Sequence, residues 1–502
     1  MIVDLSRTAP PARTVEVLVI GSGCGGATAA WDLASAGREV LVLEEGRDRT
    51  GLDFTQRDAE MYGELYMDRA GRMTEDLSIT ILQGRALGGG SVINCCDVVS
   101  IHDPVLRLWQ KRFGLTDFSP QILGPYRDRA LQDLHANVPP EAMLNRNNLL
   151  LREGATKLGW RGGVMMHNRV GCAGIGTCMI GCPADAKQNP RFVAIPGAMK
   201  AGAQFWLRAR AVRIEDANAE LKTVRVRQLD EAGLHEGDEV VVRARKVILA
   251  ANAISSAQLL LRSGVGNEHV GRHLSLQPQL PVTAIFDEEV RFFRGIPQSY
   301  AVTQLEELDE ERGFWGFRLE AISGTPGIVA SLLPRLGAEG KELMTQYSHM
   351  GALLCLLPDE PKGTVRVERS GRLRVAYQLD GEQKARYCAA AKAAASAFFA
   401  AGAREVLVPC VPPIVLRSPS DLQLLDGLSL APCTAPFLSA HQQGTVRFAP
   451  SPKDGGADPT GQVYGTRGVY VFDSSGFPTS ASSHTMAPIL TIAHYLSAQL
   501  TS

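Results

Sequence analysis

The chain has 502 residues, more than a single hydrophobic core usually organises, so we expect at least two domains. Apolar residues make up 45%, charged residues 21%, and the formal net charge is −1, which is an ordinary globular composition. This charge balance gives no basis for a nucleic-acid partner, and the chain lacks the run of roughly 18 apolar residues that predicts a membrane span. The N-terminus carries no visible secretory signal, so we expect a cytoplasmic protein with reduced cysteines.

The first elements read as a strand, a helix and a second strand. Residues 15–20 (VEVLVI) are an apolar, β-branched run typical of a buried strand. Residues 27–36 are small and helix-forming, and Gly37 follows them as a helix stop. Residues 39–43 predict a parallel strand that ends at Glu44. Together these segments predict a βαβ unit.

The turn inside this unit has the pattern of a dinucleotide-binding site. Gly21, Gly23 and Gly26 have the G-x-G-x-x-G spacing, which suits a tight turn, close approach of backbone to a pyrophosphate, and packing of helix on strand. Glu44 lies about twenty residues farther on, where a carboxylate can accept hydrogen bonds from ribose hydroxyls. A structural glycine turn alone would not explain this acidic strand end.

The rest of the chain alternates between helical and strand patterns. Helices are expected at 58–68, in parts of 103–134, and at 255–262, 381–401 and 484–499. Strands are expected at 211–229 and 239–249, joined by an acidic turn, and at 468–473. From 271 to 357 the chain shows short strands and turns, the pattern of an antiparallel sheet.

Strand–helix–strand patterns near both ends, with sheet signals between them, predict an α/β protein. We expect a discontinuous Rossmann-like cofactor domain with an inserted substrate domain that combines an antiparallel sheet with helices. The cofactor domain would comprise 14–110, 195–275 and 430–502. A connecting region with clustered cysteines would span 111–194, and the substrate domain would span 276–429.

Further motifs identify the cofactor by resemblance. They are 84–94 (GRALGGGSVIN), 247–264, His441-x-x-Gly444-Thr445, and 471–479 followed by His484. With the fingerprint and 43–46 (LEEG), these segments resemble, in the same order, the motifs of the glucose–methanol–choline (GMC) family of FAD-dependent oxidoreductases. The chain departs from the family pattern at Asn252, where glycine is usual, and at Ala257, where proline is usual.

The resemblance implies that FAD is bound by residues spread over the whole chain. Backbone N–H groups of Gly88, Gly89, Gly90 and Ser91 would contact the flavin, and Asn94 would bond to its ring or ribityl chain. Asp473 would accept from ribityl or phosphate-linked hydroxyls, and Val212 would bracket the adenine with its backbone.

The resemblance also assigns roles to two histidines. Oxidation of an alcohol requires transfer of a hydride to flavin N5 and loss of a proton from oxygen, and neutral histidine is suited to accept that proton. His441 is implied to be the base, and His484 its partner that binds and orients the substrate oxygen. Two solvent-facing or capping histidines are the alternative.

The 276–429 region gives a hint about the substrate. It is rich in apolar residues, which favours an apolar or bulky alcohol, although the same residues could simply form a core: Ile322, Ile328, Val329, Leu332, Leu333, Leu353 and Leu354.

A cysteine cluster, Cys172-x5-Cys178-x3-Cys182-Pro183, leaves three alternatives open. The spacing is similar to segments of long-chain alcohol oxidases and of bacterial FAD-dependent dehydrogenases, and in the latter it implies a [3Fe–4S] cluster. His167 could instead complete a zinc site with the three cysteines. The third alternative is a structural loop without metal.

The function expected from these patterns is FAD-dependent oxidation of a small-molecule alcohol, by an oxidase or an alcohol dehydrogenase. The electron acceptor would be oxygen or another acceptor, including a partner protein. Two rival functions stay open. One is a GMC-fold isomerase, lyase or decarboxylase, and the other is an electron-transfer dehydrogenase subunit with an iron–sulfur cluster.

Overall fold

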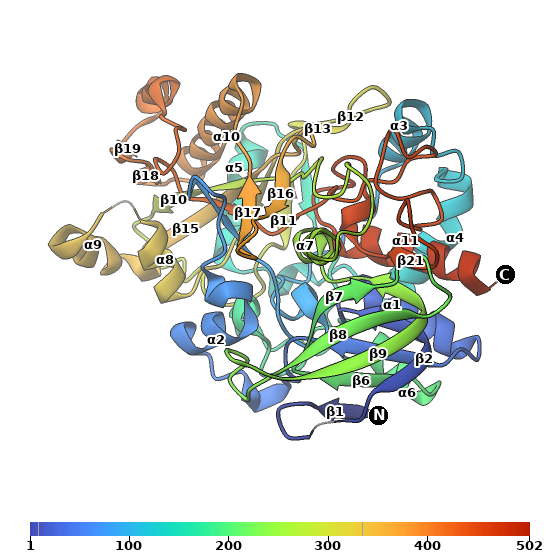
Figure 1. Cartoon of the computed structure of the whole chain (residues 1–502). Coiled ribbons are helices and arrows are strands. Elements are labelled where there is room, and N and C mark those ends of the chain that lie inside the picture. Colours follow the sequence, from blue (N-terminus) through green and yellow to red (C-terminus); the bar gives the residue numbers. More distant parts are fainter. Residues whose placement is uncertain (9, 334, 502) are drawn as a thin grey trace.

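The computed structural model describes residues 1–8, 10–333 and 335–501, which form two large sheets with helices packed on them (Figure 1). The first sheet has the order β1-β6-β3-β2-β9-β8-β7, and β21 pairs with β9. Its strands are β1 (Ile2–Asp4), β2 (Arg13–Ile20), β3 (Val40–Glu44), β6 (Gln204–Leu207), β7 (Ala209–Glu215), β8 (Lys222–Leu229), β9 (Glu236–Leu249) and β21 (Val469–Val471).

The parallel half of this sheet is buried on both faces. β2 pairs in parallel with β3 and with β9, and Leu18, Val19, Leu41 and Val42 have no exposed surface. Such near-continuous apolar strands are expected where helices cover both faces. α1 (Cys24–Ser35) packs against α6 (Ala194–Lys200) and α11 (Met486–Thr501), and α11 packs against α4 (Pro120–Asp133).

The second sheet has the order β19-β18-β10-β15-β14-β11-β5, with β20 pairing β10 and β4. All of its pairs are antiparallel except the parallel pair β20–β4. Its strands are β4 (Ile79–Ile81), β5 (Gly162–Val164), β10 (Gln279–Ile285), β11 (Tyr300–Val302), β14 (Arg318–Ala321), β15 (Met350–Leu356), β18 (Glu405–Val408), β19 (Ile414–Leu416) and β20 (Phe437–Ser439).

The long helix α10 (Gly381–Ala400) packs on this sheet and on α5 (Arg146–Lys157). The remaining elements are α2 (Asp58–Leu65), α3 (Asp103–Phe113), α7 (Ala253–Ser263), α8 (Pro326–Leu332), α9 (Gly337–Met344), β12 (Glu306–Asp309), β13 (Gly313–Gly316), β16 (Thr364–Val367) and β17 (Leu373–Ala376). None of the helices in the described ranges combines the length and apolarity needed to cross a bilayer.

The predicted α/β class is confirmed, and one local prediction is wrong. Residues 211–229 are not one strand, because the polar segment after Glu215 reverses the chain and makes β7 and β8 an antiparallel pair. The 271–357 region also contains α8 and α9, and α8 begins at Pro326, a residue favoured in a first helical turn. The domain boundaries stay a prediction; β4, β5 and β20, from outside 276–429, join the second sheet.

The contact between α5 and α10 requires a glycine. A Cβ at Gly154 would overlap the carbonyl oxygen of Ala397 on α10. We expect Gly154→Ala to lower the free energy of unfolding by about 1–3 kcal/mol, measured by urea denaturation, because the helices would have to separate. The control is Gly63→Ala in α2, whose Cβ would lie 3.6 Å from Arg69 Nε. Equal denaturation midpoints for the two variants would contradict this assignment.

Candidate active site

One cavity of about 490 Å³ is lined by residues from both sheets. Most of the residues predicted to bind FAD or act in catalysis line it together: Gly21, Gly23, Glu44, Gly89, Gly90, Ser91, Asn94, His441, Asp473 and His484. Gly26, Gly88 and Val212 do not line it. The structure therefore brings ten predicted residues, far apart in sequence, to a common space.

The three fingerprint glycines serve different purposes. A Cβ at Gly26 would overlap the carbonyl oxygen of Gly21, so Gly26 allows α1 to start directly against the turn. A Cβ at Gly23 would meet only Gly89 Cα, at 3.8 Å, and Gly23 lines the cavity. Gly26 is therefore required by packing, whereas Gly23 keeps the cavity free of a side chain.

Glu44 is fixed by hydrogen bonds from the fingerprint turn. Its Oε2 accepts from Ser22 N at 3.0 Å and Ser22 Oγ at 2.6 Å, and its Oε1 accepts from Gly46 N at 2.7 Å. Burial raises the pKa of the Glu44 carboxyl. The Ser22 hydroxyl also accepts from Gly88 N at 3.1 Å, so Gly88 braces the turn from outside the cavity.

Val212, predicted to bracket the adenine, does not line the cavity. Val212 lies at an irregularity of the β7–β8 pairing, where the register shifts between Ala211 and Arg213. Such a bulge displaces the extra residue from the regular ladder. Ala209, Arg210 and Ala211 line the cavity in its place.

Asp473 and Asn94 both line the cavity and both have protein partners. Asp473 accepts from Ser256 Oγ at 2.6 Å and from Ser475 N at 2.9 Å, and burial raises its pKa. Asn94 accepts from Cys96 N at 3.2 Å, which fixes its amide.

These features fit FAD. A Cβ at Gly90 would meet no atom within 4 Å, so the backbone of this loop faces open space in the cavity, as contact with a bound group requires. The N-terminus of α1, where helix N–H groups and the helix dipole favour a phosphate, lines the same cavity through Gly23 and Cys24.

The two histidines come together from separate loops. His441 follows β20, His484 lies just before α11, and their ring centroids are 5.1 Å apart in an edge-to-face arrangement. Both side chains are buried, at 8% and 7% exposure, and both line the cavity. The amide of Gln279 on β10 contacts His441 Nδ1 at 3.2 Å, and the Ser483 hydroxyl contacts His484 Nδ1 at 3.1 Å.

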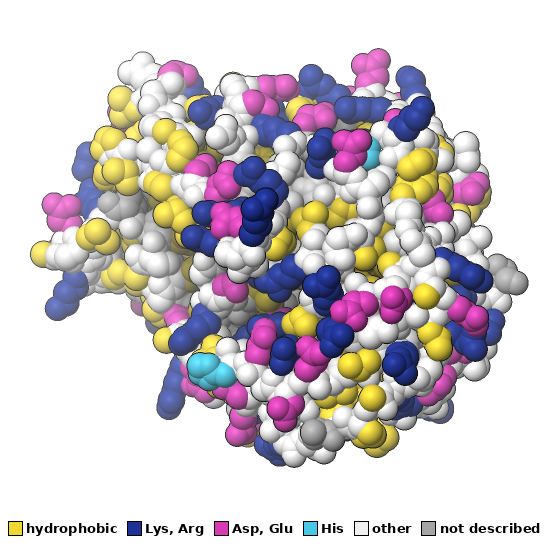
Figure 2. Space-filling model, viewed as in Figure 1, with side chains coloured by type: hydrophobic (Ala, Val, Ile, Leu, Met, Phe, Trp, Pro, Cys, Tyr) yellow, Lys and Arg dark blue, Asp and Glu magenta, His cyan; other side chains and the backbone are white. Residues whose placement is uncertain are grey.

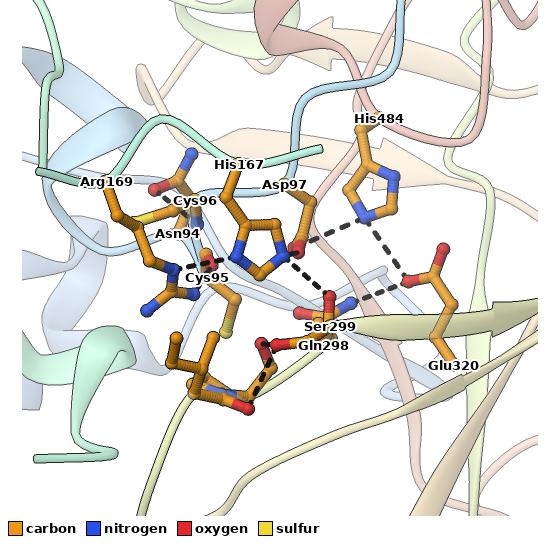
Figure 3. Close-up of polar contacts among 12 residues, drawn as sticks. Asn94, Cys95, Cys96, Asp97, His167, Arg169, Gln298, Ser299, Glu320 and His484 are labelled. Carbon is orange, nitrogen blue, oxygen red and sulfur yellow. Dashed lines mark hydrogen bonds and ion pairs between the residues drawn. The ribbon is translucent and has the colours of Figure 1, made fainter. Parts of the chain in front are cut away.

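The surroundings shift the pKa values of the two rings in opposite directions. Burial, together with the neighbouring His484, lowers the pKa of His441 to about 3. Burial would also lower the pKa of His484, but the carboxylates of Glu320 and Asp97 outweigh it and raise that pKa. His484 Nε2 lies 3.4 Å from Glu320 Oε2 and 3.6 Å from Asp97 Oδ2 (Figure 3). The site thus favours the neutral form of His441 and the protonated form of His484.

Sequence reasoning missed these carboxylates. Glu320 on β14 has no exposed surface and accepts from Gln298 Nε2 at 2.8 Å. Arg318, two residues earlier, lies 3.3 Å from Glu320 and 2.8 Å from Glu306. Two opposite charges two residues apart share one face of a strand, which was a usable signal for an inward-facing ion pair. Asp97 follows the 84–94 motif but belongs to no recognised pattern.

A metal site at Cys172, Cys178 and Cys182, one of the alternatives left open by the sequence, is not supported. Among the described residues, no group of three or more His, Cys, Asp or Glu side chains could hold a metal ion. Arg169 provides the positive charge instead: its Nη1 lies 3.5 Å from Cys178 Sγ and 3.9 Å from Cys172 Sγ. Cys182 Sγ accepts from Ala186 N at 3.4 Å. A [3Fe–4S] cluster is therefore not supported.

The zinc alternative fails for a related reason. His167 Nδ1 accepts from Arg169 Nε at 2.8 Å, and His167 Nε2 lies 2.9 Å from the carbonyl oxygen of Gln298. Both ring nitrogens are therefore engaged by protein groups, and neither is available to a metal ion.

Comparison with known proteins identifies the family. The GMC oxidoreductase models match residues 16–279 and 359–493. The chain belongs to the GMC oxidoreductase family. It is a flavin-dependent oxidoreductase acting on CH–OH groups.

Two relatives show the range of similarity. An uncharacterized GMC-type oxidoreductase of Mycobacterium tuberculosis H37Rv is 34% identical, over 98% of this chain and 76% of the relative. A long-chain-alcohol oxidase of Arabidopsis thaliana is 26% identical, over 97% of this chain and 67% of the relative.

Solved structures share the fold. Pyridoxine 4-oxidase from Mesorbium loti superimposes with a TM-score of 0.72 at 16% identity, covering 97% of this chain and 99% of that one. A formate oxidase variant of Aspergillus oryzae RIB40 gives 0.67 at 14% identity, covering 98% and 99%.

The role of Gly23 in keeping the cavity free of a side chain is testable. We expect Gly23→Val to fold but to lose most of its FAD, because the new side chain enters the cavity without a backbone clash. The flavin-to-protein absorbance ratio should fall at least about tenfold, whereas far-UV circular dichroism should stay unchanged. Ser35→Val, at the exposed end of α1, is the control and should retain FAD. Full flavin content in Gly23→Val would contradict the proposed path of the cofactor.

Proposed function

We propose that this enzyme oxidises an extended, apolar alcohol to a carbonyl compound, with His441 as the base and His484 as the group that holds the substrate oxygen. The observation that carries this proposal is that His441 and His484, whose pKa values are shifted in opposite directions, lie 5.1 Å apart in the cavity that the fingerprint glycines also line. Two like residues with pKa values driven apart by their surroundings are the usual basis for separate roles in proton transfer.

In this mechanism the two histidines have separate roles. The positive charge of the His484 imidazolium attracts the substrate oxygen and stabilises negative charge as it develops there. Neutral His441 accepts the hydroxyl proton at Nε2. Bound FAD would supply the hydride acceptor at N5.

The base role of His441 depends on the orientation of one amide. The structure places Gln279 Nε2 at 3.2 Å from His441 Nδ1. When the amide is rotated by a half-turn, its oxygen faces Nδ1, Nδ1 carries the hydrogen, and the Nε2 lone pair is free to accept a proton. The two ends of an amide differ by a half-turn of the group, and the hydrogen-bond network decides between them. We infer that the Gln279 oxygen faces His441 in the working enzyme.

The lining of the cavity supports an apolar substrate. Ile322, Ile328, Val329, Leu332, Leu333 and Leu354, six of the apolar residues noted in the sequence, line it. Leu353 instead is fully buried in the core. Residues of this kind exclude water and favour an alkyl chain over a sugar.

A second cavity supports an extended shape for this substrate. It measures about 720 Å³ and shares part of its wall with the first: Leu82, Ile328, Leu332, Leu333, Pro409 and Leu438 line both. Leu77 and Val411 at its margin are 60% and 61% exposed. Hydrophobic side chains also gather on the surface around α8 and β18 (Figure 2). An alkyl tail that passes between Ile328 and Leu332 would therefore remain in apolar surroundings.

The relatives' names point the same way, since several are long-chain-alcohol oxidases. The unusual GMC chemistries and the electron-transfer subunit have no specific observation in their favour. Electron transfer to oxygen or to another acceptor, and the cytoplasmic location, stay predictions.

The base assignment is tested by His441→Ala. This variant should retain FAD, but long-chain alcohol should reduce the flavin about 10²–10⁴ times more slowly under anaerobic stopped-flow conditions, because the proton has no acceptor. His235→Ala, a surface change in the β8–β9 hairpin, should reduce at the wild-type rate. If His441→Ala also reduces at that rate, His441 is not the base.

The substrate assignment is tested at the wall shared by the two cavities. Leu332→Trp should narrow the passage and lower kcat/KM for a long primary alcohol about tenfold or more, with little effect on butanol. Leu336→Trp is the control, because Leu336 is 87% exposed and lines neither cavity. An equal loss for both alcohols in Leu332→Trp would rule out the second cavity as the tail site.

A further inference from the structure

Two buried residues outside the substrate cavity connect it to the cysteine cluster. His167 has no exposed surface and Arg169 is 7% exposed, and neither lines the active-site cavity. His167 Nε2 lies 3.1 Å from Asp97 Oδ1, and the other oxygen of Asp97 faces His484. Figure 3 shows the resulting sequence of contacts, Arg169–His167–Asp97–His484. Every member is buried, so solvent screens these contacts little.

Arg169 determines which nitrogen of His167 carries the hydrogen. Arginine only donates hydrogen bonds, so His167 Nδ1, which receives the bond from Arg169 Nε, must be unprotonated. The single hydrogen of His167 is then on Nε2, and it is donated to the Gln298 carbonyl oxygen at 2.9 Å. Asp97 Oδ1 lies 3.1 Å from the same nitrogen, so the N–H side of the His167 ring faces one oxygen of Asp97 while the other oxygen faces His484.

The backbone keeps these residues in register. Asp97 and His167 form an isolated antiparallel bridge, with Val98 N donating to Met166 O at 2.9 Å and Asn168 N donating to Cys96 O at 3.0 Å. The segment that carries Asp97 therefore cannot move relative to the segment that carries His167 without breaking buried hydrogen bonds.

The cysteine-rich loop contacts Arg169, the residue in this series of contacts that lies farthest from His484. Arg169 donates to Cys95 O and lies within 3.9 Å of the sulfur atoms of Cys178 and Cys172. A hydrogen bond from Cys96, with the Arg169 and Lys187 cations, holds the pKa of Cys178 well below its ordinary value. A Cys178 thiolate would be the counter-ion that a buried guanidinium needs.

We propose that His167 and Arg169 are positioning residues of the reaction, which hold Asp97 against His484, and that the cysteine-rich loop serves to anchor Arg169. This rests on the proposed function only for the role of His484 in catalysis. The cysteine cluster thereby acts on the active site through an arginine and a histidine and requires no metal.

The charge of His484 is set by groups on three elements. Asp97 faces it from the loop after the 84–94 motif, Glu320 and Arg318 from β14, and His441 from the loop after β20. The carboxylates raise the pKa of His484, so its cationic form persists above the usual pH and is lost as pH rises through the raised pKa. If Asp97 is no longer held in place, that loss moves to lower pH.

The test compares His167→Leu with His167→Gln in the FAD-loaded enzyme. Leucine removes the hydrogen bonds with Arg169 and Gln298 and the polar contact with Asp97, whereas the glutamine amide can still accept from Arg169 and present an N–H toward Asp97. We expect His167→Leu to slow anaerobic flavin reduction about tenfold to a hundredfold and to shift the basic limb of its pH profile to lower pH. His167→Gln should retain most of the wild-type rate of flavin reduction and most of the wild-type pH profile. Arg169→Met, which leaves His167 in place, is a second variant and should act in the same direction.

His494→Leu is the matched control. His494 is also a buried histidine between carboxylates, with Nδ1 2.7 Å from Asp32 and Nε2 3.0 Å from Asp133, but it lies outside the cavity. The His494→Leu variant should have a lower melting temperature but should keep the wild-type pH profile of flavin reduction. A uniform loss of rate in His167→Leu, with the wild-type pH profile, would show a merely structural role and overturn the proposal.

A second readout does not depend on any alcohol. In protein labelled with ¹⁵N-histidine, His484→Asn identifies the His484 resonance by its disappearance. At neutral pH this resonance should be that of an imidazolium in the wild type and should change to the neutral form in His167→Leu. An unchanged His484 charge state would overturn the proposal even if alcohol reduces the flavin. Failure of every alcohol to reduce the flavin would instead reject the proposed function and leave this result standing.

Discussion

The proposed chemistry depends on one buried positive charge, a His484 imidazolium held between two buried carboxylates. An isolated ion of this kind would be expelled or neutralised in a protein interior, so Asp97 and Glu320 must both be present and oriented. Both carboxylates also have polar neighbours: Arg318 and the Gln298 amide contact Glu320, and His167 Nε2 lies 3.1 Å from Asp97. The low pKa of His441 follows from its burial and from the neighbouring His484, whose positive charge opposes protonation of the His441 ring.

This arrangement explains why part of the site could be predicted from the sequence and part could not. The fingerprint glycines, Glu44 and the loop ending at Asn94 are local: a tight turn, a strand end and a close backbone approach each demand particular residues at fixed spacing. Glu320 and Asp97 interact with His484, which is distant from both in sequence, and no pattern near either carboxylate indicates that partner. Val212 shows the same limit, since a bulge one residue long was enough to turn its neighbour Ala211 toward the cavity.

The cysteine cluster illustrates how one pattern can serve two chemistries. Closely spaced thiolates need positive charge nearby, and their spacing does not say whether a metal ion or a side chain supplies it. The guanidinium of Arg169 lies three residues before Cys172 and belongs to neither of the metal-site patterns considered for this segment. Asn252 is a simpler departure: it adopts a φ of 78°, which asparagine tolerates better than most residues, and its side chain caps α7 through Ile254 N.

The elements that carry the site come from every part of the fold. Asp97 follows the glycine-rich loop, Glu320 belongs to the second sheet, and His484 precedes the C-terminal helix that packs on α1. No isolated part of the chain can therefore assemble the charge balance around His484, which forms only when both sheets and α11 have docked. The same docking closes the cavity between the fingerprint and the apolar wall of α8. Folding and the assembly of the proton-transfer groups are thus one event, because the buried cation is stable only in the completed structure.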